Sequence, residues 1–236
     1  MDNHFSDNLI DQIKEDPNNN YFTNVLIETI KISKVPKKTL DVGCGNGVFT
    51  EILKKQFKSE LVGVDGNQHG LDVCEKRGFD KTFLIKDFSK DKLSMIEDLD
   101  YDLAISKDVL EHIINPEHAI NEIWKKIKKG GFFLLHVPNH FPFFGRLKFL
   151  FKNNIDTFNY FPDCSRNNFP HIRFYTYNSV LQLFSKYNFK IIKNFSSNFF
   201  VFPIINKIIN KKLKEKLVLN YPDHFSEAYT LLIKKI

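Results

Sequence analysis

The stretch Thr39-Leu-Asp-Val-Gly-Cys-Gly-Asn-Gly-Val-Phe49 decides the fold, because an apolar run breaks there into three glycines at alternate positions. This pattern predicts a buried strand, a tight glycine turn and the start of the first helix. Glycine lets the backbone approach a ligand closely, and a helix start offers unpaired N–H groups. We therefore expect a charged ligand at this turn.

The spacing of the glycines argues against two common phosphate-binding turns. A dinucleotide fingerprint, Gly-x-Gly-x-x-Gly, would need a glycine where Val48 stands. A P-loop would need a lysine after the glycines, and none follows them. Instead Asp41 precedes the turn, and its carboxylate would repel a pyrophosphate and attract a cation.

The segment Leu40-Asp-Val-Gly-Cys-Gly-Asn-Gly47 resembles motif I of the class I S-adenosylmethionine-dependent methyltransferases. Their cofactor is a sulfonium with an amino-acid tail, which suits an acidic residue beside a glycine turn. The resemblance implies that Asp41, Gly43, Gly45 and Gly47 bind the cofactor.

Later segments extend the resemblance. Leu61-Val-Gly-Val-Asp65 predicts a second strand, and its terminal Asp65 stands where a nucleoside-binding sheet places a carboxylate on the ribose hydroxyls. Lys81-Thr-Phe-Leu-Ile-Lys-Asp87 predicts a third strand. The resemblance implies that Asp87 and Phe88 contact the adenine.

A fourth strand, Tyr101-Asp-Leu-Ala-Ile-Ser106, runs into Lys107-Asp-Val-Leu-Glu-His-Ile113. This is similar to the subgroup with Leu-Glu-His after the strand, which includes ubiquinone-pathway O-methyltransferases and many small-molecule and sugar methyltransferases. Within that resemblance Lys107 is expected on the cofactor side. His112 is as readily a structural residue as a catalytic one.

The remaining pattern predicts an α/β fold with a doubly wound, mostly parallel seven-stranded sheet. Asn115-Pro116 starts a helix that we expect to run through Lys129 and to end at Gly130-Gly131 before a strand, Phe132–Pro138. Further expected elements are a helix over 178–187, a strand over 189–192, a basic amphipathic helix over 203–218 and an antiparallel last strand over 228–235.

We expect a single methyltransferase domain over 1–236, with an N-terminal helical cap over 1–35 and a substrate lid over 139–175. The lid segment is rich in Phe, Asn and Pro and leaves the edge of the sheet where ligands bind in open α/β folds.

Composition limits the class of protein. The net charge of +6 comes from lysine, in a chain rich in Asn, Ile, Lys and Phe, so it does not by itself indicate nucleic acid. Cys44, Cys74 and Cys164 form no C-x-x-C pair, which argues against a disulfide framework or a zinc cluster. The polar start of the chain and the lack of a long apolar run predict a cytoplasmic protein.

Methyl transfer to a hydroxyl usually needs a base. The candidates follow the fourth and fifth strands: His112, His136, His140 and His171. His136 falls within a strand and is expected to be packed, whereas His140 and His171 flank the lid and have the better positions. If the acceptor is a hydroxyl, we expect one of these two to set an acidic limb in the pH profile.

A metal ion is the alternative. Asp108, Glu111 and His112 could offer ligands on one helical turn, and a similar Glu-x-x-Glu-His pattern binds a divalent ion in some relatives. This chain has Asp where that pattern has its first Glu, and carboxylates at helix starts are often caps. The sequence-based expectation is therefore no metal.

Arginine is rare, and three of the four arginines, Arg146, Arg166 and Arg173, fall on the lid and its return. A planar guanidinium binds a phosphate or carboxylate through two parallel hydrogen bonds. We expect these arginines and Tyr175 to bind an anionic acceptor; the alternative is that the arginines tie the lid to nearby acids.

Two functions are compared. The first is S-adenosylmethionine-dependent O-methylation of a small metabolite, quinone precursor or precursor of a cell-surface glycan. The second is a peripheral membrane or nucleic-acid binding protein that retains the cofactor fold, suggested by the Phe- and Lys-rich lid and the lysines over 207–216. Nucleic-acid methyltransferases of this fold often carry Asn/Asp-Pro-Pro-Tyr/Phe after the fourth strand, where this chain has Ser106-Lys-Asp-Val109.

Overall fold

The computed structural model describes residues 21–97, 99–152, 171–196 and 209–236. The first part of the expected cap, the middle of the lid (153–170) and the start of the expected basic helix lie outside these residues, as do Cys164 and Arg166. The elements follow one another in this order: α2 (Tyr21–Ser33), β1 (Lys38–Val42), α3 (Glu51–Lys55), β2 (Glu60–Asp65), α4 (Gln68–Lys76), β3 (Lys81–Leu84), η1 (Leu93–Met95), β4 (Tyr101–Lys107), η2 (Leu110–His112), α5 (Pro116–Lys126), β5 (Ile127–Pro138), α6 (Phe143–Lys152), α7 (Tyr177–Gln182), β6 (Phe189–Asn194), α9 (Lys211–Asn220), α10 (Pro222–Phe225) and β7 (Ala228–Lys235).

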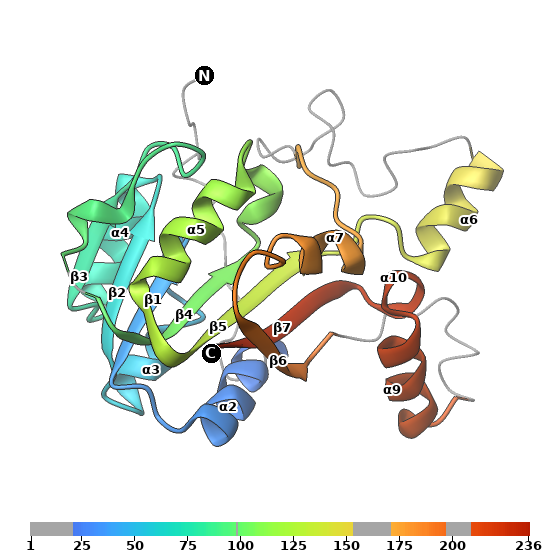
Figure 1. The fold of residues 1–236 in the computed structure, drawn as a ribbon, viewed down its shortest axis with the longest axis horizontal. Helices are drawn as coiled ribbons and strands as arrows, with labels where there is room; N and C mark the ends of the chain where they lie inside the picture. Colours follow the sequence, from blue (N-terminus) through green and yellow to red (C-terminus); the bar gives the residue numbers. More distant parts are fainter. Residues whose placement is uncertain (1–20, 98, 153–170, 197–208) are drawn as a thin grey trace.

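The strands form one seven-stranded sheet in the order β3-β2-β1-β4-β5-β7-β6 (Figure 1). The first five strands are parallel, and β7 inserts antiparallel between β5 and β6. The expected doubly wound fold is confirmed. Because the chain winds outward from β1 in both directions, the neighbours β1 and β4 mark the topological switch point, where such sheets bind ligands.

Two hydrophobic cores sandwich the sheet, because successive side chains of a strand point to opposite faces. On β5, Phe133 and Leu135 face one core, which α5 and α7 cover, whereas Leu134 faces the other core, which α2, α3 and α4 cover. The α2 helix contributes the fully buried Leu26. The second helix of the expected cap therefore packs on the sheet.

The expected end of α5 is wrong. The helix stops at Lys126, and Gly130 and Gly131 lie inside β5. The pairing of β4 with β5 is irregular here, since Tyr101 pairs with Ile127 but Leu103 pairs with Phe132. Gly130 has a φ of +79°, and a Cβ on Gly131 would lie 2.9 Å from the Tyr101 carbonyl oxygen. These glycines serve a bulge in the strand rather than a helix end.

Several other boundaries also differ from expectation. β3 ends at Leu84, before Asp87, and α7 ends at Gln182 instead of 187. The basic helix α9 starts at Lys211. The first part of the expected lid, which lacks a regular sequence pattern, forms helix α6.

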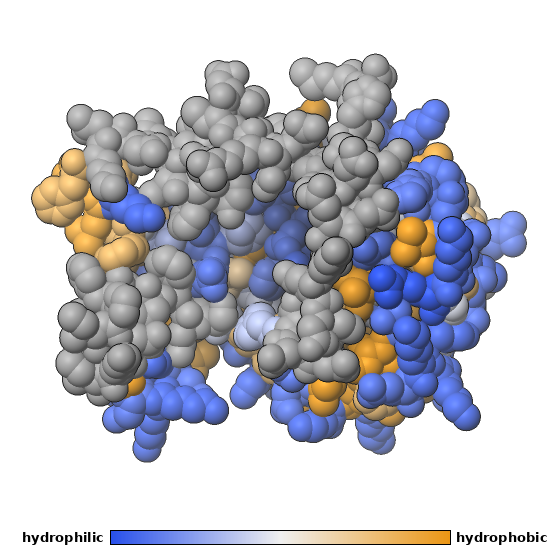
Figure 2. Space-filling view, turned by 180° about the vertical axis from the view of Figure 1, so that it is seen from behind, coloured by the Kyte–Doolittle hydropathy of each residue, from blue (hydrophilic) through white to orange (hydrophobic). Residues whose placement is uncertain are grey.

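The outer end of the molecule carries exposed apolar side chains. Phe149, Leu150 and Phe151 of α6 are 49%, 68% and 79% exposed, and Figure 2 shows apolar surface at this end of the protein. Within the described ranges, no helix combines the length and apolar character needed to cross a membrane.

Candidate active site

The glycine turn after β1 requires its glycines. Gly43, Gly45 and Gly47 all have φ between +55° and +73°, a region that side-chain-bearing residues rarely adopt. A Cβ on Gly43 would lie 2.2 Å from a methyl of Val109, so the turn packs directly against the segment after β4. A Cβ on Gly45 would meet nothing within 4 Å. The turn is therefore open at Gly45.

Asp41 is buried beneath the turn. Its carboxylate accepts a hydrogen bond of 2.5 Å from the hydroxyl of Thr50. Burial, with a smaller contribution from the nearby Asp65, raises the pKa of Asp41 to about 7 against the opposing effects of Thr50 and Lys107. A cation bound above the turn would stabilise the ionised form, as expected of an acid that faces a sulfonium cofactor.

Asp65 links the glycine turn to the end of β2. Its two oxygens accept hydrogen bonds from the backbone N–H groups of Gly45, at 2.8 Å, and of Asn67, at 2.9 Å. Burial raises its pKa, although these donors favour the charged form. The turn N–H of Gly45 is thus held by a carboxylate within the protein. A carboxylate has lone pairs beyond these two bonds with which to accept from ribose hydroxyls.

The remaining residues expected at the cofactor lie at three places around the same edge. Asp87 follows β3 and pairs with Lys90 at 3.1 Å, while Phe88 is partly buried against the core. Lys107 ends β4, forms an ion pair with Asp108 and lies over the ring of Phe49, 4.6 Å from its centre. All three residues follow or end a parallel strand, so they lie at the carboxyl edge of the sheet, where the cofactor is expected.

A second group of polar residues follows β4, next in the chain to Val109, the residue that packs against the glycine turn. Asp108 has a φ of +53°, which sets the direction of the chain into η2. Glu111 on η2 is fully buried, and burial together with Asp108 raises its pKa well above the usual range. Neither carboxylate oxygen of Glu111 has a hydrogen-bond partner among the described residues.

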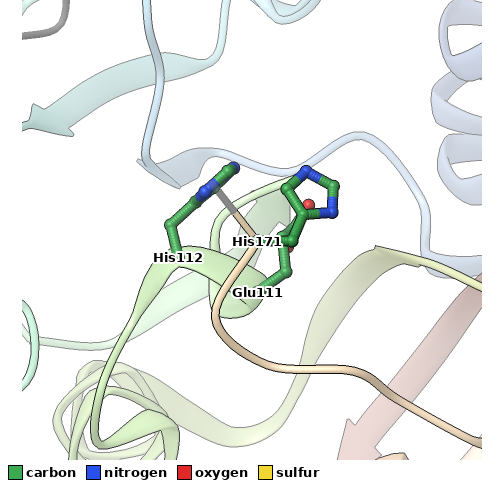
Figure 3. Close-up of side chains that lie close together, drawn as sticks. All are labelled: Glu111, His112 and His171. Atoms are coloured by element: carbon green, nitrogen blue, oxygen red, sulfur yellow. The ribbon is translucent and has the colours of Figure 1, made fainter. Parts of the chain in front are cut away.

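Three side chains meet at this point (Figure 3). Glu111 and His112 come from η2, and His171 comes from the segment before α7. Each offers a ligand atom that lies within 4.8 Å of the other two. The rings of His112 and His171 lie edge to face with their centres 4.7 Å apart. Residues 59 positions apart in the chain therefore form one cluster.

His140 joins this cluster through His171. Its Nε2 lies 2.7 Å from His171 Nδ1, a hydrogen-bond distance. Burial, with a contribution from His112, lowers the pKa of His140 to about 4 and that of His171 to about 3. Both imidazoles are therefore neutral at pH 7.

His136 is packed, as its place in a strand predicts. Its Nδ1 lies 2.7 Å from the hydroxyl of Thr230, and its Nε2 lies 3.4 Å from a carboxylate oxygen of Asp108. Burial lowers the pKa of His136 to about 4, despite the neighbouring Asp108. Asp108 is thus held by Lys107 and His136 and does not join the group of Glu111, His112 and His171.

The residues expected to bind the acceptor lie in two different places. Arg146 donates to the carbonyl oxygens of Phe141 and Asp223, which ties α6 to α10. Arg173 donates to the carbonyl oxygen of Ile114, and the hydroxyl of the buried Tyr175 donates to that of Leu110. Arg173 and Tyr175 therefore brace the segment around η2.

Sequence reasoning missed that Glu111 and His171 meet. The available signal was that Glu111 follows one inner strand and His171 follows the lid, because segments leaving neighbouring strand ends converge at one edge. The parallel bridge between Asn139 and Tyr175 brings the end of the lid back beside β5. That return places His171 over η2.

Comparison with known proteins agrees with this geometry. Residues 19–194 match the family described as "Methyltransferase domain". A ubiquinone biosynthesis O-methyltransferase from Shewanella halifaxensis is 30% identical over 106 residues, 44% of each chain. A mitochondrial enzyme of the same description from Dictyostelium discoideum is 29% identical over 128 residues, 46% of this chain and 40% of the relative. The matches span less than half the length of these relatives.

Solved structures share the fold. An S-adenosylmethionine-dependent methyltransferase from Clostridium acetobutylicum superimposes with a TM-score of 0.62 at 18% identity, covering 97% of this chain and 96% of that one. The magnesium protoporphyrin IX methyltransferase of Synechocystis, solved with bound SAH, gives a TM-score of 0.59 at 14% identity, with 91% and 82% covered.

The sheet order and the glycine turn are those of the S-adenosylmethionine-dependent methyltransferase fold. The chain belongs to the methyltransferase domain family, since the match covers most of its length.

Proposed function

We propose that the protein transfers the methyl group of S-adenosylmethionine to a hydroxyl oxygen of a small molecule. The carrying observation is the contact of Gly43 with Val109, which sets the glycine turn directly beside the cluster of Glu111, His112 and His171. A methyl donor held at the turn has its acceptor beside these polar side chains. The ubiquinone biosynthesis O-methyltransferases among the relatives support an oxygen acceptor.

Each of the cofactor residues binds a different part of the methyl donor. Asp41 and Gly45 bind the cationic amino-acid end, Asp65 binds the ribose, and Asp87 with Phe88 binds the adenine. Bound there, the cofactor would supply an activated methyl group to an acceptor oxygen that approaches in line with the carbon–sulfur bond, and His140 or His171 would take up the hydroxyl proton. The protein's main contribution is the geometry of approach.

His140 and His171 are the proposed partners of the acceptor hydroxyl, because they lie with Glu111 and His112 in the group that follows β4. Because both are neutral at pH 7, each can accept a hydrogen bond or a proton. Their lowered pKa values make them weak bases, since a general base works best with a pKa near the working pH. A second means of activating the hydroxyl would therefore accelerate the reaction.

The finer substrate assignment is a metabolite or glycan precursor that carries a phosphate or carboxylate. Among the described arginines, Arg173 supports it best, because it follows His171 by two positions and lies beside η2. Arg146 supports it less, since its contacts are to backbone carbonyls of α6 and α10.

The test is transfer of labelled methyl from the cofactor to a panel of hydroxyl- and amine-bearing small molecules, including acidic ones. We expect saturable cofactor binding and label recovered in an ether linkage. Label recovered only on nitrogen, or no binding of the cofactor, would overturn the proposal.

Contact with a membrane surface is the second candidate, favoured by the exposed apolar side chains Phe149, Leu150 and Phe151. Flotation with anionic vesicles separates the two. A protein that binds vesicles but not the cofactor would support the second candidate and refute the first.

A further inference from the structure

The cluster after β4 contains a buried carboxyl group, that of Glu111, whose oxygens have no hydrogen-bond partner among the described residues. Five carboxylic side chains of the described residues are buried: Asp41, Glu51, Asp65, Glu111 and Glu122. All except Glu111 accept hydrogen bonds from a hydroxyl, a backbone N–H, a guanidinium or an ammonium group. A buried carboxylate without a partner is costly, so its place needs an explanation.

The surroundings of Glu111 are rich in nitrogen ligands. His112 and His171 bring imidazoles to within 4.8 Å of its carboxylate, counted between the ligand atoms. Among the described residues, no lysine or arginine donates a hydrogen bond to the Glu111 carboxyl group. One carboxylate and two imidazoles at this separation are a donor set that a metal ion can draw together.

Backbone contacts hold the cluster in place. The N–H groups of Ile172 and Arg173 both donate to the carbonyl oxygen of Glu111, at 2.9 and 3.0 Å. The hydrogen bond between His140 and His171 Nδ1 orients the His171 ring. A metal-binding histidine commonly uses its second nitrogen for such a bond, which fixes both the tautomer and the ring.

We propose that Glu111, His112 and His171 bind a divalent transition-metal ion and that His140 positions His171 for it. Two imidazoles with one carboxylate suit Zn²⁺, Mn²⁺ or Fe²⁺ better than Mg²⁺, which prefers oxygen ligands. Three protein ligands leave coordination positions for other groups. This inference differs from the sequence-based expectation of no metal, and its ligand set has His171 where the alternative set had Asp108.

The role of the ion rests on the proposed function. An acceptor hydroxyl bound at an open position would lose its proton more readily, because a metal ion lowers the pKa of a bound hydroxyl or water. In that arrangement His171 would serve as a ligand rather than as a base, since its Nδ1 is bonded to His140. Binding of the ion itself does not depend on this role and is measured without an acceptor.

The experiment is calorimetric titration of chelator-treated protein with Mn²⁺ and, separately, with Zn²⁺. We expect one ion to bind per chain in the wild type. Glu111→Gln and His171→Ala should each weaken binding by at least about tenfold, and His140→Ala by roughly 10- to 100-fold. Glu122→Gln, at a buried carboxylate that has partners, and His118→Gln, on α5, are the controls and should retain wild-type affinity.

Cofactor affinity is measured on the same samples and should be unchanged in every variant. Absence of saturable binding of both ions, or wild-type affinity in Glu111→Gln and His171→Ala, would overturn the inference. It would leave the proposed function standing if the cofactor still binds. If the wild-type protein does not bind the cofactor at all, the proposed function is refuted instead.

Discussion

The carboxyl ends of β1 and β4 are neighbours in the sheet, yet the buried carboxyl groups near them differ in their hydrogen bonding. At β1, Asp41 is bonded to Thr50, and Asp65 is bonded to Gly45. At β4, Glu111 has no hydrogen-bond partner among the described residues. The comparison teaches that the cofactor turn is completed by its own chain, whereas the cluster beside it is completed only by something bound from outside.

The largest effect is expected at the cofactor turn. Gly45→Val should weaken S-adenosylmethionine binding by about a hundredfold or more, which is about 2.8 kcal/mol, because the side chain fills the space open for the cofactor. Gly130→Val is the matched control, since Gly130 also has a positive φ and no atom within 4 Å of its Cβ position.

Both variants carry similar backbone strain, so thermal unfolding should report a similar loss of stability in each. Calorimetry should show cofactor binding in Gly130→Val only. Equal affinity in the two variants would remove Gly45 from the cofactor site.

The second prediction concerns pH and Asp41, whose pKa burial raises to about 7. Since a cation favours the carboxylate, cofactor affinity should rise with pH, by up to about tenfold per unit, until pH 7 and then level off. Asp41→Asn should flatten this dependence. Isothermal titration from pH 5.5 to 8 checks it, and parallel curves for the two proteins would contradict the assignment.

Stability of the cofactor-free protein should move the opposite way. A carboxyl with a raised folded pKa contributes most below its unfolded pKa near 4, and that contribution is lost as pH rises toward 7. Between pH 5 and the folded pKa the loss is about 2.7 kcal/mol, at 1.36 kcal/mol per unit. Denaturant unfolding of wild type and Asp41→Asn at pH 5 and 7.5 measures this difference.

The smallest effect tests the acceptor side. If the acceptor carries an anion, Arg173→Lys should raise its apparent KM by roughly tenfold, because an ammonium cannot form the bidentate contact. Cofactor affinity should not change. Arg77→Lys is the control, because Arg77 follows α4 and forms an ion pair with Glu51; this variant should leave KM unchanged. An unchanged KM in Arg173→Lys returns the arginine to bracing η2.

Local sequence predicted the strands and the glycine turn well. The sheet, the glycine turn and the places of Asp41 and Asp65 follow from short apolar runs and adjacent glycines, because each signal lies within a few residues of what it determines. The same reasoning failed at Gly130 and Gly131, since a bulge inside a strand and a helix end use glycine alike.

The acceptor side could not be predicted in this way. His171 meets Glu111 only through the return of the chain after the lid, where Ile172 and Arg173 bond to the Glu111 carbonyl. No local pattern encodes that contact, so the sequence offered Asp108, the adjacent acid, as the third ligand. In the structure Asp108 is held by Lys107 and His136.

The most direct test of the contrast between the two strand ends is one paired titration of Gly45→Val and Glu111→Gln with S-adenosylmethionine and with Mn²⁺. We expect Gly45→Val to lose the cofactor and retain the ion, and Glu111→Gln to lose the ion and retain the cofactor. Loss of both ligands in both folded variants, or of neither, would contradict the division of the edge into a self-completed cofactor turn and a ligand-completed cluster.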